Sequence, residues 1–168
     1  KKDYGKWQDI SEANVRKELE ITRTYLDSLH TNFKIETLDE QTKISYRLFE
    51  KVCEDVIENF QWHLFDYPIN QMGGLHTDVP TFLINVHSIE NKSDAEAYVS
   101  RLNGISNLFD QLIDNLKLRE TQNIIPPKFV FPYVLNDCKN MTSGQPFDKS
   151  GGVNPLLEDF MKKVNALK

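Results

Sequence analysis

Histidines come first among the residues of this sequence that could do chemistry, because imidazole is the commonest metal ligand in proteins. A zinc hydrolase places two of them at fixed helical spacing, as in HExxH, so that both face one metal ion. His30, His63, His76 and His87 do not form that pattern. The nearest cluster is His76, Asp78 and His87, in a segment with no helical framing to hold its geometry. We therefore predict no metal site and no cofactor within this chain.

Nucleophilic catalysis finds equally little support in the sequence. There is no GxSxG elbow, and no histidine lies close in sequence to Cys53 or Cys138, although a pairing in space stays open. We interpret both cysteines as small buried hydrophobic residues, and a disulfide between them remains an alternative if the protein is exported. The pair Gly73 and Gly74 lacks the following Lys of a phosphate-binding loop. We predict no catalytic residue.

The most unusual segment is FDYPINQMGGLHTDVPTFLIN, residues 65–85, which has a glycine pair, two prolines and very little charge. Its apolar side chains are too many to be left in water together. We interpret residues 65–92 as one long irregular loop that folds back on the rest of the chain, with VPTFLINV as a short extended piece.

Amides and an imidazole embedded in this apolar loop need hydrogen-bond partners. They either staple the loop to the core through its own backbone or face a ligand, with glycines that allow a close backbone approach. The residues alone leave both alternatives open. The candidates for contact with a substrate are Asn70, Gln71, Gly73, Gly74 and His76.

Helical periodicity dominates the remainder of the chain. Ser11 and Asp39 can begin helices that run to about His30 and about Trp62. Three carboxylates of the second helix, Glu54, Asp55 and Glu58, belong to its solvated polar face. The apolar faces expected to be covered are Val15, Leu19, Leu26 and Leu29 in the first helix, and Ile44, Leu48, Val52, Val56 and Phe60 in the second.

Three further helices are predicted. Ser93 and Glu96 form a capping box before a long helix whose apolar residues alternate steps of three and four. Pro126 and Pro127 suit the first turn of a fourth helix to about residue 141, which Pro132 should kink or restart. Asn154 and Pro155 predict the start of the last helix. The fold class is all-α, a bundle of about five helices. The apolar positions of the long helix are Ala95, Tyr98, Leu102, Ile105, Phe109, Leu112 and Leu116.

Composition limits the classes of partner. With 168 residues the chain fits one domain, spanning residues 1–168. A net charge of −5 and the lack of a basic stripe argue against nucleic acid. No window approaches the roughly 18 apolar residues of a membrane span. The opening KKDYGKW lacks the apolar core of a signal peptide, which a protein trimmed of its leader would lack as well.

Several ordered motifs carry a resemblance to a known family. They are YPINQMGGLHTDVPTFLINVHSI, SDAEAYVSRLNGISNLFDQLIDNLK, IIPPKFVFPYVL, TSGQPFD and NPLLEDFMKKV. Together, from about Phe49 onward, they resemble the N-terminal part of the bacterial family called domain of unknown function 885. The resemblance implies a larger helical, zincin-like metallopeptidase fold, and many members look exported or lipid-anchored, so it favours the bacterial cell envelope.

Members of that family are several times longer than this chain, and their histidine and glutamate zinc motif lies in the C-terminal half. No residue here matches that motif. The resemblance therefore implies that this chain is an N-terminal helical fragment, which forms a wall of a peptide-binding cleft while zinc is bound by the missing part. The alternative is a stand-alone helical protein-interaction module without enzymatic role. In the first case we expect an exposed apolar face and self-association through it.

Overall fold

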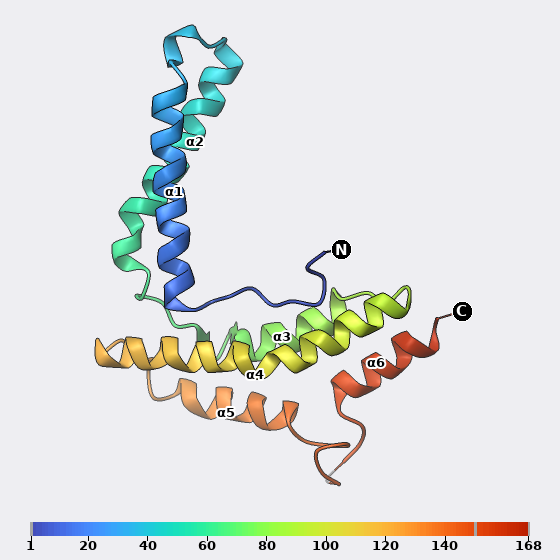
Figure 1. Cartoon of the computed structure of the whole chain (residues 1–168). Helices are drawn as coiled ribbons and strands as arrows, with labels where there is room; N and C mark the ends of the chain where they lie inside the picture. The colour runs from blue at the N-terminus through green and yellow to red at the C-terminus, as the bar shows by residue number, and fades with distance from the viewer. Residues whose placement is uncertain (1, 150, 168) are drawn as a thin grey trace. The chain divides into compact units, whose positions relative to one another are not determined.

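The computed structural model describes residues 2–149 and 151–167, and helices dominate them (Figure 1). The chain is 67% helical, with a single two-stranded sheet among the described residues, so the all-α prediction is confirmed. Contacts divide it into two units. The hairpin unit comprises residues 10–66, and the main unit comprises residues 2–9 together with the described residues from 67 onward. The prediction of one domain over residues 1–168 stays a prediction.

The hairpin unit is built from two antiparallel helices, α1 (Glu12–Asn32) and α2 (Glu40–Asn59), which lie side by side (Figure 1). The Ser11 hydroxyl accepts a hydrogen bond from the backbone N–H of Asn14 at 3.3 Å. The Asp39 carboxylate accepts one from the N–H of Thr42 at 3.0 Å. Both predicted starts are confirmed, because each cap satisfies a donor that the first turn leaves unpaired. Short 3₁₀ turns follow at Ile35–Thr37 and Phe60–Trp62.

The two helices differ in how well their covered faces were predicted. On α1 the predicted face is buried or half-buried, with Leu19 only 7% exposed. On α2 the predicted face is wrong, because it remains largely open to solvent. Tyr46, Cys53 and Ile57 are the covered side chains of α2 instead. The four residues of the predicted face that are exposed, hereafter the α2 stripe, are Ile44 (62%), Leu48 (65%), Val52 (52%) and Val56 (46%).

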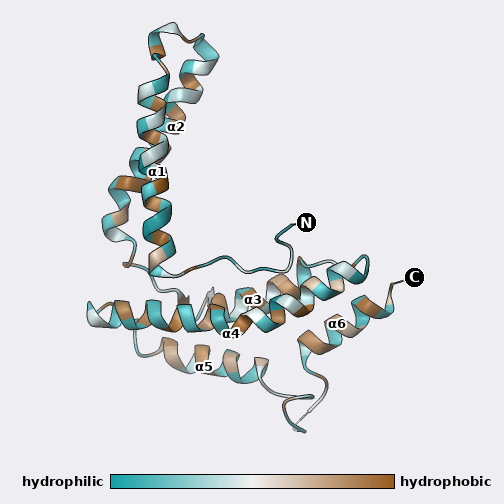
Figure 2. Ribbon diagram, viewed as in Figure 1, coloured by the Kyte–Doolittle hydropathy of each residue, from teal (hydrophilic) through white to brown (hydrophobic). Residues whose placement is uncertain are grey.

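The main unit contains the remaining helices and the sheet. Its longest helix, α4, runs alongside α3 and α5 (Figure 1), and hydrophobic and hydrophilic segments alternate along it (Figure 2). The elements are β1 (Ile69–Asn70), β2 (Gly73–Gly74), α3 (Leu75–Asn85), α4 (Lys92–Thr121), α5 (Val130–Met141) and α6 (Pro155–Asn165).

Residues 65–92 are not one irregular loop, which corrects the prediction. They hold the antiparallel β1–β2 hairpin and the helix α3, so the expected extended piece VPTFLINV is also wrong. Pro80 lies inside α3, where its missing N–H removes the hydrogen bond that the His76 carbonyl would accept. Burial of Val79 (4% exposed) and Leu83 (0%) on one helix face offsets that loss.

Helix α4 keeps its predicted face but begins differently. Its N-cap is Asn91, whose side-chain oxygen accepts from the N–H of Asp94 at 3.1 Å, so the capping box at Ser93 is wrong. All seven predicted apolar positions are buried or half-buried. Packing explains the glycine at position 104 of this helix, because a Cβ on Gly104 would lie 3.1 Å from the Trp7 ring.

The proline signal is confirmed for the last helix and wrong for the fourth. Helix α5 begins at Val130, so Pro126 and Pro127 precede the helix and do not form its first turn. Pro132 lies in the first turn instead, where a missing N–H costs no hydrogen bond, so the expected kink or restart is also wrong. Helix α6 begins at Pro155 with Asn154 as N-cap, as predicted.

Candidate binding cavity beside His76

An apolar cavity of about 380 Å³ lies where four helices of the main unit meet. Helix α3 contributes three residues, α4 two, α5 two and α6 one, and the segment between α5 and α6 supplies the rest. No Lys, Arg, Asp or Glu of the described chain is among them. The lining residues are His76, Val79, Pro80, Ile105, Phe109, Cys138, Met141, Thr142, Phe147 and Leu156.

Thr142 and His76 are the polar side chains among these residues, and the buried one is His76. Its side chain is only 3% exposed, and neither ring nitrogen has a hydrogen-bond partner within the described chain. Nε2 lies 3.6 Å from Oδ2 of Asp137, which is beyond hydrogen-bond range. Leaving a buried donor or acceptor unpaired costs about 1–3 kcal/mol. Both nitrogens are themselves buried, so the imidazole carries this cost in the described structure.

The rim of the cavity is fixed by Asn154, which is 2% exposed. Its amide nitrogen donates to the carbonyls of Met141 at 2.9 Å and Ser143 at 3.2 Å, and its oxygen accepts from the N–H of Leu156 at 3.0 Å. One side chain thus caps α6 and ties the preceding segment to the end of α5. Phe147 of that segment lines the cavity while 63% exposed, so it lies at the solvent side.

The other predicted contact residues lie on the β1–β2 hairpin. Asn70 pairs with Gly73 across it, and the Asn70 side-chain oxygen accepts from the N–H of Met72 at 2.8 Å. Gln71 is exposed, and Met72 is 90% exposed. Of the five candidates, only His76 lines the cavity. A role in substrate contact stays a prediction for all five.

Gly74 shows why the glycine pair is needed. It adopts φ +130°, and a Cβ would lie 2.4 Å from the carbonyl oxygen of Pro68 and 2.8 Å from the Cα of Ile69. The close approach is therefore between Gly74 and the chain's own neighbouring strand. Gly74 is followed directly by α3.

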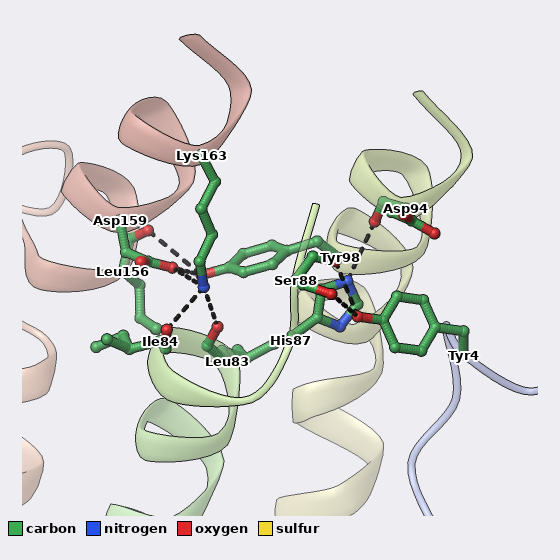
Figure 3. Close-up of polar contacts among 10 residues, drawn as sticks. All are labelled: Tyr4, Leu83, Ile84, His87, Ser88, Asp94, Tyr98, Leu156, Asp159 and Lys163. Atoms are coloured by element: carbon green, nitrogen blue, oxygen red, sulfur yellow. Dashed lines mark hydrogen bonds and ion pairs between the residues drawn. The ribbon is translucent and has the colours of Figure 1, made fainter. Parts of the chain in front are cut away.

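A polar cluster that the sequence did not reveal joins α3, α4 and α6 (Figure 3). The Lys163 ammonium donates to the carbonyls of Leu83 and Ile84, both at 2.8 Å, at the C-terminal end of α3. It also pairs with Asp159 at 2.8 Å, one turn away on α6. A cation at this end of a helix satisfies orphan carbonyls and complements the helix dipole. The i,i+4 spacing of Asp159 and Lys163 was the one available sequence signal.

His87 lies at the centre of the same cluster and is fully buried. It stacks on Tyr4 at 4.2 Å and meets Tyr98 edge-on at 5.2 Å. Its Nε2 lies 3.1 Å from the carbonyl oxygen of Asp94, so Nε2 carries the proton and donates, while Nδ1 has no partner in the described chain. Burial lowers the pKa of His87, and the charges of Arg101 and Lys163 lower it further.

Tyr98 completes this core, with none of its surface exposed. Its hydroxyl lies 3.4 Å from the Asp159 carboxylate and 3.5 Å from the carbonyl oxygen of Leu156. Burial, and then the neighbouring Asp159 charge, raise the pKa of Tyr98. The phenol therefore stays neutral and acts as a donor.

Arg101 holds the segment 2–9 to the rest of the main unit. Its Nε donates to the carbonyl of Tyr4 at 2.6 Å. The guanidinium lies against the rings of Trp7 and Phe82, 4.7 Å and 4.5 Å from their centroids, and the two rings meet edge-on. Trp7 Nε1 in turn donates to the Arg101 carbonyl at 2.7 Å. Arg101 thus makes two cation–π contacts, and burial lowers the pKa of Arg101.

Within the described residues, no group of three or more His, Cys, Asp or Glu side chains could hold a metal ion. Asp78 is exposed, so the sequence neighbours His76, Asp78 and His87 do not gather. Both cysteines are free: Cys53 is buried and Cys138 half-buried. None of the helices in the described parts of the chain is long and apolar enough to span a membrane.

The remaining two histidines lie in the hairpin unit and pair with carboxylates. His30 is in the last turn of α1, 2.7 Å from Glu50, and His63 caps the turn after α2 at 3.2 Å from Glu12. Their predicted positions near helix ends are confirmed.

Comparison with protein families gives one match. The family model described as "Bacterial protein of unknown function (DUF885)" matches residues 1–168, so the chain belongs to that family. The match extends over the hairpin unit, beyond the motifs that first suggested it. Searches of curated proteins and of solved structures gave no match.

Proposed function

We propose that this chain is a non-catalytic helical part of a zinc-dependent, peptidase-like hydrolase, where it borders the cleft that holds a peptide. Zinc would be bound by another part of the protein, as the family resemblance implies, and would activate the attacking water there. The observation that carries the binding role is the apolar cavity with the unpaired, buried His76.

The β1–β2 hairpin and the cavity both belong to the main unit, and we assign them complementary roles. The exposed tip of the β1–β2 hairpin, at Gln71 and Met72, would offer polar and apolar contacts to a peptide substrate. The cavity offers room for one apolar group. Holding a substrate at several points lowers the entropic cost of reaction at a distant metal. Location in the bacterial cell envelope is part of this proposal, on the resemblance alone.

The first test is zinc content by elemental mass spectrometry, on this chain and on the product of the uninterrupted gene, both purified without added metal. We expect about one zinc per chain in the product of the gene and none in the 168-residue chain. Absence of zinc from both would overturn the hydrolase proposal.

A second test addresses the binding role in the product of the uninterrupted gene. Gln71→Ala should lower kcat/KM for a peptide substrate with little loss of stability, whereas Gln122→Ala, at another exposed glutamine of the main unit, should change neither. An unchanged kcat/KM in Gln71→Ala would show that the β1–β2 hairpin does not contact the peptide in the cleft.

The alternative is a helical protein-interaction module without enzymatic role. The α2 stripe favours it, because four apolar side chains on one helix are left open to solvent in the hairpin unit. A protein with this role would contain no zinc in any form and would bind its partner through α2.

A further inference from the structure

We propose that the α2 stripe binds the α2 stripe of a second copy of this chain, with the two α2 helices antiparallel. This goes beyond the proposed hydrolase role, because it requires neither zinc nor a peptide. It also names a partner, which the alternative function leaves open. The spacing of the apolar residues on α2 and the order of its charges support the proposal.

The apolar contact follows from the spacing of the stripe. Its four residues follow one another at intervals of four, and each is between 46% and 65% exposed. Apolar side chains four residues apart form a ridge on a helix, and such ridges interdigitate in the commonest packing of two helices. The covered side chains Tyr46, Cys53 and Ile57 lie on a different side of α2, so packing against α1 leaves the ridge open.

Three charged side chains beside the stripe have no ion pair within the part of the chain that the structure describes. They are Arg47, Glu54 and Glu58, and all three are exposed. At 3.6 residues per turn they lie on one flank of the stripe, with the cation nearer the start of α2 and both carboxylates nearer its end. The remaining charged residues of α2 have partners: Lys43 pairs with Glu40 at 2.8 Å, Glu50 contacts His30 at 2.7 Å, and Lys51 pairs with Asp55 at 2.6 Å.

A two-fold axis through the middle of the stripe makes the stripe complementary to itself. The axis passes between Leu48 and Val52, so Leu48 of one copy meets Val52 of the other. The outer residues of the stripe, Ile44 and Val56, meet in the same way. An interface of this kind uses one surface patch twice, as in the two-fold dimers that are the commonest homo-oligomers.

The charges distinguish the antiparallel arrangement from a parallel one. An antiparallel pair places Arg47 of one copy opposite Glu54 of the other, and the symmetry repeats this contact. A parallel pair would place Arg47 beside Arg47 and Glu54 beside Glu54, where like charges repel. Exposed ion pairs add little affinity, so we expect the apolar ridge to hold the dimer and the charges to set its direction.

The experiment is sedimentation equilibrium of the 168-residue chain at rising concentration, together with the variants Arg47→Glu and Glu54→Arg. A single helix pair is a small interface, so we expect a reversible wild-type dimer with a Kd on the order of micromolar. Each variant should dimerise about threefold to tenfold more weakly, because like charges then face each other twice. The matched control is Arg23→Glu, the same charge change at an exposed arginine of α1, which should leave the Kd unchanged.

An equimolar mixture of the two variants tests the direction of the helices. When Arg47→Glu pairs with Glu54→Arg, an acidic residue again faces a basic one in both contacts. We therefore expect the mixture to have a higher average mass than either variant alone at the same total concentration. The double variant Arg47→Glu, Glu54→Arg should dimerise like the wild type. In about 1 M NaCl these differences should shrink, because the Debye length falls to about 3 Å.

Two results would overturn the proposal. One is a wild-type chain that stays monomeric over the whole concentration range, which would leave the α2 stripe to a different occupant, such as another protein or a lipid surface. The other is an equimolar mixture that is no heavier than the single variants, which would exclude the antiparallel pairing. Neither result bears on zinc content, so failure here and failure of the proposed hydrolase role are separate observations.

Discussion

At the scale of single residues, the buried imidazole of His87 makes stability depend on pH. Burial lowers its pKa in the folded chain below the ordinary value of 6.5. The unfolded chain therefore takes up a proton at a pH where the folded chain does not. The stability that His87 contributes is present above the unfolded pKa and is lost as the pH falls through the folded pKa.

We expect the free energy of unfolding to decrease from neutral pH toward about pH 5, with at most about 1.4 kcal/mol per pH unit from this one proton. His87→Phe, which keeps a ring against Tyr4 and Tyr98, should flatten that dependence. Urea unfolding at several pH values measures the difference, in which the contributions of carboxylates cancel. Parallel curves for the two proteins would show that His87 does not titrate on unfolding.

Gly74 gives the second prediction at this scale. In Gly74→Ala the new Cβ meets the carbonyl oxygen of Pro68 at 2.4 Å, in a backbone conformation with φ +130°. We expect a loss of about 1–3 kcal/mol in the free energy of unfolding. The matched control is Gly151→Ala, where nothing lies within 4 Å of the added Cβ. Equal thermal stability of both variants would contradict the described geometry of the β1–β2 hairpin.

At the scale of the elements, Lys163 links α6 to the end of α3. Lys163→Met should cost about 1–2 kcal/mol, because it removes a charged donor from two carbonyls and leaves Asp159 without its partner. Lys162→Met, on the neighbouring exposed lysine, should be close to neutral. Chemical denaturation of the two variants tests this, and equal losses would show that Lys163 does not hold the helices together.

The orientation of α2 is tested by one matched pair of substitutions. Leu19→Ala removes a side chain that is 7% exposed and should cost about 2–3 kcal/mol. Leu48→Ala removes one that is 65% exposed and should cost less than about 0.5 kcal/mol. The measurement is the free energy of unfolding of both variants. A large decrease in Leu48→Ala would mean that the α2 stripe is covered.

The same elements show what the sequence could predict. The starts of α1, α2 and α6 were predictable because caps act locally: Ser11, Asp39 and Asn154 each bond within three residues of themselves. The starts of α4 and α5 were not predicted correctly. Helix α3 was missed because Pro80 and the glycine pair are local signals for a loop, while burial of Val79 and Leu83 by other helices favours a helix. On α2, apolar spacing identified a face but not whether anything covers it.

The candidate site was predictable only in part, for a related reason. His76 stood out as a polar residue in an apolar segment. Its surroundings come from residues far apart in the chain, such as Phe109, Met141 and Phe147. No spacing rule joins them, because the cavity depends on how four helices pack. The bonds of Lys163 to carbonyls of α3, about 80 residues away in sequence, were hidden in the same way.

At the scale of the whole molecule, the α2 stripe leads to an expectation about how the chain behaves in solution. We expect the 168-residue chain to bind a hydrophobic dye and to self-associate with rising concentration. The double variant Leu48→Lys, Val52→Lys should reduce both effects, since lysines oppose apolar contact. Ile113→Lys, at an exposed apolar residue of α4, is the control and should change little. Sedimentation equilibrium measures association, and a monomeric, dye-silent wild type would contradict the expectation.

The positions of the two tryptophans offer a practical consequence of the division into two units. The sequence has only Trp7 and Trp62. Trp7 belongs to the main unit, against Arg101 and Phe82, and Trp62 belongs to the hairpin unit, 57% exposed. Each unit therefore carries its own intrinsic fluorophore. Replacing either indole by phenylalanine leaves an emission signal from one unit alone, so the unfolding of each can be followed separately within the intact chain.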